Sequence, residues 1–118
     1  RVCPFDVVAS KYGIRCQGAD EIALTKLDVL SGHEEIEVCE AYELNGKILT
    51  EFPFTDVLDD CKPVFKKMKG WNSDISACRK KEDLPKEALD YIRYIERACN
   101  CKIRYVSVGA ERDAYIEM

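Results

Sequence analysis

The sequence of 118 residues lacks the short motifs by which many enzymes are identified. It contains neither of the two common glycine-rich loops that hold phosphates, Gly-x-x-x-x-Gly-Lys-Ser/Thr and Gly-x-Gly-x-x-Gly. Its one histidine, His33, follows Ser31-Gly32 in a predicted exposed loop, and no Ser/His/Asp or Cys/His set assembles around it. The residues by themselves therefore indicate a chain that recognises a ligand without catalytic groups of its own.

Long apolar runs and an excess of basic side chains are also missing. No run of about 18 apolar residues occurs, and no basic segment precedes an apolar stretch, so we predict neither a membrane span nor a secretory signal. The 18 Lys and Arg against 22 Asp and Glu give a net charge of −4, whereas a nucleic-acid surface needs clustered positive charge. We therefore expect a cytoplasmic protein that binds neither nucleic acid nor membranes.

The length suits one domain, or one piece of a larger domain. Hydrophobic residues make up 47% of the chain, which is enough for a buried core. The first residue is Arg1 rather than methionine, so we expect further residues to precede it in the natural protein.

The chain contains seven cysteines, and no pair of them has the Cys-x-x-Cys spacing of a zinc knuckle or redox site. The odd count leaves one thiol unmatched in any full disulfide pairing. We therefore interpret them as reduced, mostly buried small hydrophobic residues, and we expect no metal site. A disulfide scaffold or a cysteine metal domain is the weaker alternative. The cysteines are residues 3, 16, 39, 61, 78, 99 and 101.

Hydrophobic patterning predicts an α/β or α+β unit in which strands, including one antiparallel hairpin, are flanked by helices. The expected elements are a helix over 4–12 ended by Gly13, a buried strand over 22–30, hairpin strands over 36–44 and 47–52 joined by Asn45-Gly46, a short strand near 63–68, a helix capped by Asp83 with an apolar stripe of Ala88, Tyr91, Ile92, Ile95 and Cys99, and strands over 102–108 and 114–118. Trp71, in a turn after Gly70, is predicted to be a packing residue.

The first candidate site is Thr25-Lys26-Leu27-Asp28, at the end of the predicted buried strand. An aspartate carboxylate can accept two hydrogen bonds from the guanine edge, one from the ring N–H and one from the exocyclic amine. The stem of Lys26 can lie over the same base. The alternative is a salt-bridge partner at a strand end, and spacing alone favours that alternative.

The second candidate site is Ser107-Val108-Gly109, where a strand breaks at a glycine. Without a side chain, Gly109 lets backbone groups approach a flat ligand closely. Because ligands of open α/β sheets sit beyond the carboxyl ends of strands, the two candidate segments can converge on one pocket. An ordinary turn is the alternative here.

Several segments, in this order and spacing, resemble the C-terminal part of the adenylosuccinate synthetases. The string Thr-Lys-Leu-Asp-Val-Leu-Ser-Gly is highly specific, and the resemblance covers essentially the whole chain. The matching stretches are residues 5–8, 24–32, 38–42, Gly70-Trp71, Leu84-Pro85 with Ala88 and Tyr91-Ile92, and 107–109. The sequence departs from the usual family pattern at Cys3-Pro4, His33, Lys69 and Ala110.

The resemblance implies a P-loop NTPase-like α/β fold, of which residues 1–118 form a single C-terminal domain or fragment. It also implies a GTP-dependent ligase of AMP biosynthesis that joins IMP and L-aspartate through 6-phosphoryl-IMP, with Mg²⁺, as a homodimer. The GTP-binding residues implied in this chain are Arg1, Lys26, Leu27, Asp28, Ser107, Val108 and Gly109. The catalytic groups, the metal ligands and nearly all IMP contacts would belong to the N-terminal part, so we expect this chain alone to be inactive. A stand-alone nucleotide-binding or protein-interaction module without ligase activity is the alternative.

Overall fold

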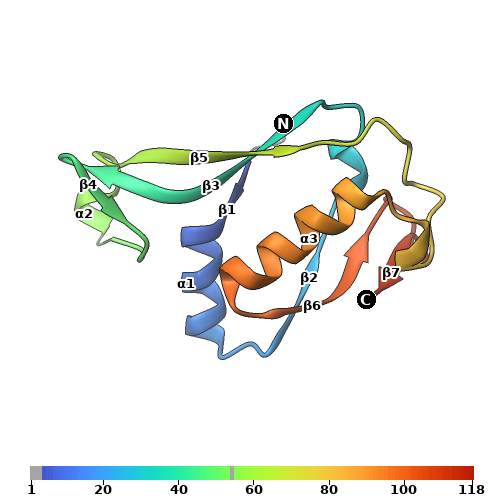
Figure 1. Cartoon of the computed structure of the whole chain (residues 1–118). Coiled ribbons are helices and arrows are strands. Elements are labelled where there is room, and N and C mark those ends of the chain that lie inside the picture. The colour runs from blue at the N-terminus through green and yellow to red at the C-terminus, as the bar shows by residue number, and fades with distance from the viewer. Residues whose placement is uncertain (1–3, 54) are drawn as a thin grey trace.

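The computed structural model describes residues 4–53 and 55–118, which form two small sheets packed with two longer helices (Figure 1). In chain order the elements are β1 (Phe5–Asp6), α1 (Val7–Gln17), β2 (Glu21–Leu24), the 3₁₀ turn η1 (Leu27–Leu30), β3 (Glu35–Leu44), β4 (Lys47–Leu49), α2 (Thr55–Leu58), β5 (Lys62–Lys69), the 3₁₀ turn η2 (Lys81–Asp83), α3 (Lys86–Cys99), β6 (Lys102–Ser107) and β7 (Tyr115–Glu117).

The first sheet is built around the long strand β3. Strand β1 pairs with β3 in parallel, while β4 and β5 pair with it antiparallel. Asn45 and Gly46 have φ of 52° and 83°, the left-handed conformation of a tight hairpin turn, so the predicted hairpin is confirmed. Its second strand ends at Leu49 instead of continuing to residue 52. In Figure 1 β3 and β5 run side by side as a long arm with β4 and α2 at one end, and α1 packs against β3.

The second sheet consists of β2, β6 and β7. Strand β2 runs parallel to β6, and β7 returns antiparallel on the other side of β6. The β6 and β7 strands confirm the two strands predicted at this end of the sequence. Helix α3 crosses this sheet in Figure 1, and the helix contacts β6.

Helix α3 contributes most of the helical core. All five members of its predicted apolar stripe are buried, which confirms the stripe: Ala88, Tyr91, Ile92, Ile95 and Cys99. The predicted cap at Asp83 is wrong, because this residue ends η2 and the helix begins after Pro85 without a side-chain cap. Proline suits this position because its fixed φ is compatible with the start of a helix.

The predicted N-terminal helix is shifted along the chain. Asp6 caps α1 by accepting a 2.9 Å hydrogen bond from the Ala9 backbone N–H, so the helix begins at Val7 rather than at residue 4. Gly13 lies inside the helix, and the helix ends before Gly18, whose φ of 63° is the left-handed conformation of a C-cap. An interior glycine costs about 1 kcal/mol, which packing of the helix can offset.

The cysteine side chains are free thiols at all six positions that the structure describes. Cys39, Cys99 and Cys101 are buried, and desolvation raises the pKa of Cys99 to about 11. Cys16 is exposed, and Cys3 lies outside the described residues. In residues 4–53 and 55–118, no group of three or more His, Cys, Asp or Glu side chains is placed to hold a metal ion. In the same residues, no helix has the length and apolarity needed to cross a membrane.

Candidate functional site

The two predicted recognition segments leave the same edge of the β2–β6 sheet. The parallel register pairs Leu24 with Val106, so the chain continues from neighbouring carboxyl ends into Thr25–Asp28 and into Ser107–Gly109. The turn η1, which contains Asp28, also contacts β6. This edge is where open α/β sheets bind ligands.

Strand β2 is shorter than predicted because the chain turns sharply at Lys26. The strand ends at Leu24, and the Lys26 backbone has φ of 59° and ψ of 38°. Residues other than glycine rarely adopt this left-handed conformation. The extended ladder cannot continue through such a residue, so Leu27 to Leu30 form a 3₁₀ turn instead of strand. Backbone strain of this kind clusters at binding sites.

The side chains of the Lys26-Leu27-Asp28 segment have different surroundings. Lys26 is exposed and Asp28 is half-buried, whereas Leu27 is only 1% exposed and packs in the core. Leu27 therefore offers little exposed side-chain surface to a ligand. Within residues 4–53 and 55–118, neither Lys26 nor Asp28 forms an ion pair, so the salt-bridge alternative finds no support there.

The Ser107–Gly109 segment is a tight, internally bonded loop. The Ser107 hydroxyl donates to the Gly109 carbonyl oxygen at 3.1 Å, and the Val108 N–H donates to the Ala114 carbonyl oxygen at 2.9 Å. A Cβ on Gly109 would lie 3.0 Å from the Ala114 Cβ, so the glycine permits the loop to close against Ala114. The Val108 side chain is fully buried.

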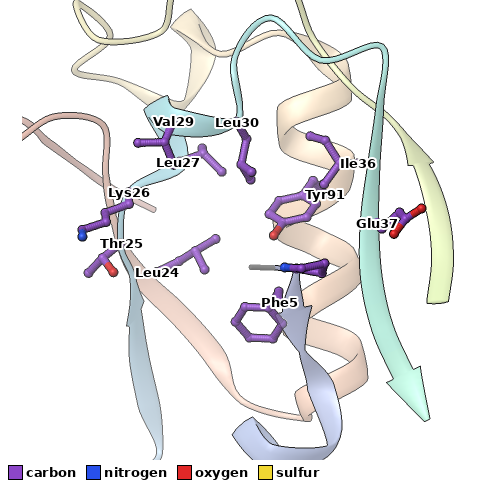
Figure 2. A pocket seen from close by; sticks show the side chains of 11 residues that line it. Phe5, Leu24, Thr25, Lys26, Leu27, Val29, Leu30, Ile36, Glu37 and Tyr91 are labelled. Carbon is purple, nitrogen blue, oxygen red and sulfur yellow. The ribbon is translucent and has the colours of Figure 1, made fainter. Parts of the chain in front are cut away.

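A partly open cavity of about 270 Å³ lies beside residues 25–27 (Figure 2). Figure 2 shows the Tyr91 ring of α3 between Ile36 and Phe5, with Leu24 and Lys26 on the opposite side. Burial raises the pKa of the Tyr91 hydroxyl to about 12, so this group stays neutral near pH 7. The lining residues are Pro4, Phe5, Leu24, Thr25, Lys26, Leu27, Val29, Leu30, Ile36, Glu37 and Tyr91.

The structure brings some of the predicted site residues together and separates others. Lys26 and Leu27 line the cavity, whereas Asp28 and residues 107–109 are not among its lining residues. Arg1 lies outside the described residues. His33 is exposed in the loop before β3, as expected. Tyr91 and Phe5 line the cavity without having been identified as site residues, because Tyr91 was predicted only as part of the apolar helical stripe and Phe5 only as part of the N-terminal helix.

Comparison with known proteins shows which family the chain resembles. The family model of adenylosuccinate synthetase matches residues 1–116. The adenylosuccinate synthetase of Trichodesmium erythraeum is 48% identical over 109 residues, covering 92% of this chain and 25% of the relative. That of Geotalea daltonii is 46% identical over 113 residues, covering 95% of this chain and 26% of the relative.

A solved structure shows the same fold. The fully ligated adenylosuccinate synthetase of Plasmodium falciparum superimposes with a TM-score of 0.89 at 35% sequence identity. The match covers 97% of this chain and 28% of that structure. The chain thus spans about a quarter of the length of the relatives it matches.

Proposed function

The chain belongs to the adenylosuccinate synthetase family, and we propose that it supplies the guanine-recognition part of this ligase. The complete enzyme would join IMP and L-aspartate to form adenylosuccinate, with hydrolysis of GTP to GDP and phosphate, in AMP biosynthesis. The role of this chain is to hold and identify the base of GTP. The α/β fold of the family is present here in two sheets with flanking helices.

The observation that carries the proposal is the shared sheet edge. The register of β2 with β6 puts Lys26–Asp28 beside Ser107–Gly109, so a flat base can lie between a carboxylate and a glycine-containing loop. The Asp28 carboxylate accepts from the guanine ring N–H and the exocyclic amine, which adenine does not offer together. The Lys26 stem covers one face of the base.

The chemical steps are assigned to the rest of the enzyme. The described residues contain one histidine, which is exposed, and no cluster of side chains suited to a metal ion. We therefore place the Mg²⁺ ligands, the general base and most contacts to IMP and L-aspartate outside this chain, and we propose a homodimer for the complete enzyme. The isolated chain is expected to form no adenylosuccinate in a coupled assay, and measurable turnover would contradict this assignment.

A specificity exchange at Asp28 tests the proposed function. The experiment uses a chimera in which residues 1–118 replace the aligned segment of the Trichodesmium erythraeum synthetase, with the unaltered chimera as reference. In Asp28→Asn the carboxylate becomes one acceptor and one donor, which fits xanthine, since xanthine has a carbonyl where guanine has an amine. GTP binding should weaken by about 2–3 kcal/mol, roughly 30- to 150-fold, while XTP becomes a substrate.

The matched control is Glu111→Gln, which removes a carboxylate from an exposed position in the loop after Gly109. It should leave the KM values for GTP and XTP unchanged. Direct titration of GTP into the isolated chain, with and without Asp28→Asn, provides the same comparison without turnover. An unchanged preference for GTP over XTP in Asp28→Asn would refute the assigned role.

A further inference from the structure

Two short segments that lie far apart in the sequence, Ser31-Gly32 and Gly70-Trp71, are hydrogen-bonded to each other at the end of η1. The Trp71 indole Nε1–H donates to the Ser31 hydroxyl oxygen at 3.0 Å, and the Gly32 N–H donates to the Trp71 carbonyl oxygen at 2.9 Å. On the other side of the loop, the Gly70 N–H donates to the Glu34 carbonyl oxygen at 2.7 Å. We call Ser31, Gly32, Gly70 and Trp71 the clasp.

The clasp depends on close contact between two backbone segments. A Cβ added to Gly70 would lie 2.0 Å from the His33 carbonyl oxygen and 2.9 Å from the His33 carbonyl carbon. Only glycine fits there without a shift of the backbone. The exposed loop around His33 is therefore fixed to the end of β5.

The clasp is anchored in the hydrophobic core through its tryptophan. Trp71 is 3% exposed, and its ring meets the Tyr91 ring of α3 edge to face, with centroids 5.9 Å apart. A buried aromatic pair of this geometry holds both rings in place. The indole N–H therefore points at Ser31 from a fixed position.

The clasp is connected through Ser31 to Asp28, the residue proposed to bind guanine. The Ser31 N–H donates to the Asp28 carbonyl oxygen at 3.2 Å, so the residue held by Trp71 closes the turn that carries Asp28. That turn is weak by itself, because η1 has four residues, no side-chain cap, and a left-handed residue, Lys26, before it. Its geometry therefore has to be imposed from outside.

We propose that Trp71, acting through Ser31, is a positioning residue for guanine recognition: it holds η1 so that the Asp28 carboxylate meets both donors of the base. This inference rests on the proposed function of Asp28. Trp71 itself touches Ser31 and Tyr91 and acts on the nucleotide through the backbone of η1.

Two substitutions in the chimera remove the hydrogen bond and keep the packing. Ser31→Ala deletes the acceptor, and Trp71→Phe deletes the donor while leaving an aromatic ring against Tyr91. Each should raise the KM for GTP about five-fold, the change that corresponds to one net hydrogen bond. The values of kcat and of the KM for IMP should stay unchanged, because the rest of the enzyme supplies those groups. Ser31→Thr retains a hydroxyl and should restore the KM for GTP.

A base-discrimination ratio separates positioning from general stability. ITP lacks the exocyclic amine of GTP, so a well-placed Asp28 prefers GTP, and Ser31→Ala should reduce the ratio of the KM for ITP to that for GTP. Loss of stability alone would leave this ratio constant. Ser73→Ala, an exposed serine in the segment after Trp71, is the matched control and should change neither value.

A second measurement uses the isolated chain, in which Trp71 is the one tryptophan. GTP should change its fluorescence in a saturable way, ATP should not, and Ser31→Ala should raise the half-saturating GTP concentration about five-fold. Unchanged GTP constants and ITP/GTP ratio in Ser31→Ala, together with the expected effect of Asp28→Asn, would overturn the positioning role alone. If Asp28→Asn also has no effect, the proposed function fails, and the positioning role fails with it.

Discussion

Replacing Gly70 by alanine is the most direct perturbation of the contact between β5 and the loop before β3. The added methyl carbon would lie 2.0 Å from the His33 carbonyl oxygen, whereas real contacts of this kind are rarely shorter than 3.0 Å. The opposing atom is backbone, so no side-chain rotation relieves the overlap. The two backbone segments must therefore move apart until this contact is no longer shorter than 3.0 Å.

Such a separation disrupts two backbone hydrogen bonds at once. The Gly70 N–H to Glu34 carbonyl bond is 2.7 Å long, and the Gly32 N–H to Trp71 carbonyl bond is 2.9 Å long. Each contributes about 1 kcal/mol net, and overpacking adds about 1–3 kcal/mol. Gly70→Ala should therefore lower the free energy of unfolding by about 3–5 kcal/mol.

The assay is urea unfolding of the isolated chain, followed by far-UV circular dichroism, with Gly13→Ala as the matched control. Gly13 lies inside α1, and a Cβ added there meets no atom within 4 Å. Alanine at this position should raise the free energy of unfolding by about 0.5–1 kcal/mol. A Gly70→Ala variant as stable as the unaltered chain would refute the close-contact reasoning.

Further predictions concern the cavity, the start of α1 and the strained turn. Burial raises the pKa of Tyr91 to about 12 in the folded chain, whereas an unfolded tyrosine has a pKa of about 10. The contribution of neutral Tyr91 to the free energy of unfolding is therefore complete below about pH 10 and falls by roughly 2–3 kcal/mol as the pH rises toward the folded pKa. Tyr91→Phe should reduce that fall in chemical unfolding at alkaline pH, and an unaltered pH profile would contradict it. Asp6→Ala removes the cap of α1 and the acceptor for the Tyr42 hydroxyl, so the free energy of unfolding should fall by about 2–3 kcal/mol. Asp6→Asn keeps an acceptor and should lose less stability, and equal losses in the two variants would count against the cap. Lys26→Gly should raise the free energy of unfolding by about 0.5–1 kcal/mol, because glycine adopts the left-handed φ without strain. The same variant should bind GTP more weakly in a titration. Lower stability in this variant would mean that the turn is not strained.

Local pattern was sufficient for the elements whose signals lie within a few residues. The Asn45-Gly46 hairpin and the Ala88–Cys99 stripe are correct because turn conformation and helical period depend on near neighbours. The errors lie at element ends, where tertiary contacts decide. Gly13 remains helical because α1 packs against β3 and α3, and β2 ends at Leu24 because Lys26 takes a left-handed conformation.

The candidate site was also predictable only in part from local sequence patterns. The Lys26-Leu27-Asp28 and Ser107–Gly109 segments were recognised as motifs, and their predicted places at strand ends indicated that they could converge, but the sequence did not show which strands pair. The pairing of β2 with β6 brings them to one edge. The part played by Trp71 was missed because its partner, Ser31, is 40 residues away, and a buried tryptophan in a turn indicates only packing.

The sequence by itself determined the family of this protein through the order and spacing of several motifs along the whole chain. It determined the principal helix and the hairpin through patterns among neighbouring residues, and it predicted which residues could recognise a guanine base. The tertiary structure alone decided where the strand before Asp28 stops, which segments share the sheet edge, and how Trp71 and Gly70 hold the turn in place. These features join residues from distant parts of the chain, because they depend on strand pairing, on a long-range hydrogen bond and on the backbone conformation that Lys26 adopts in the folded protein.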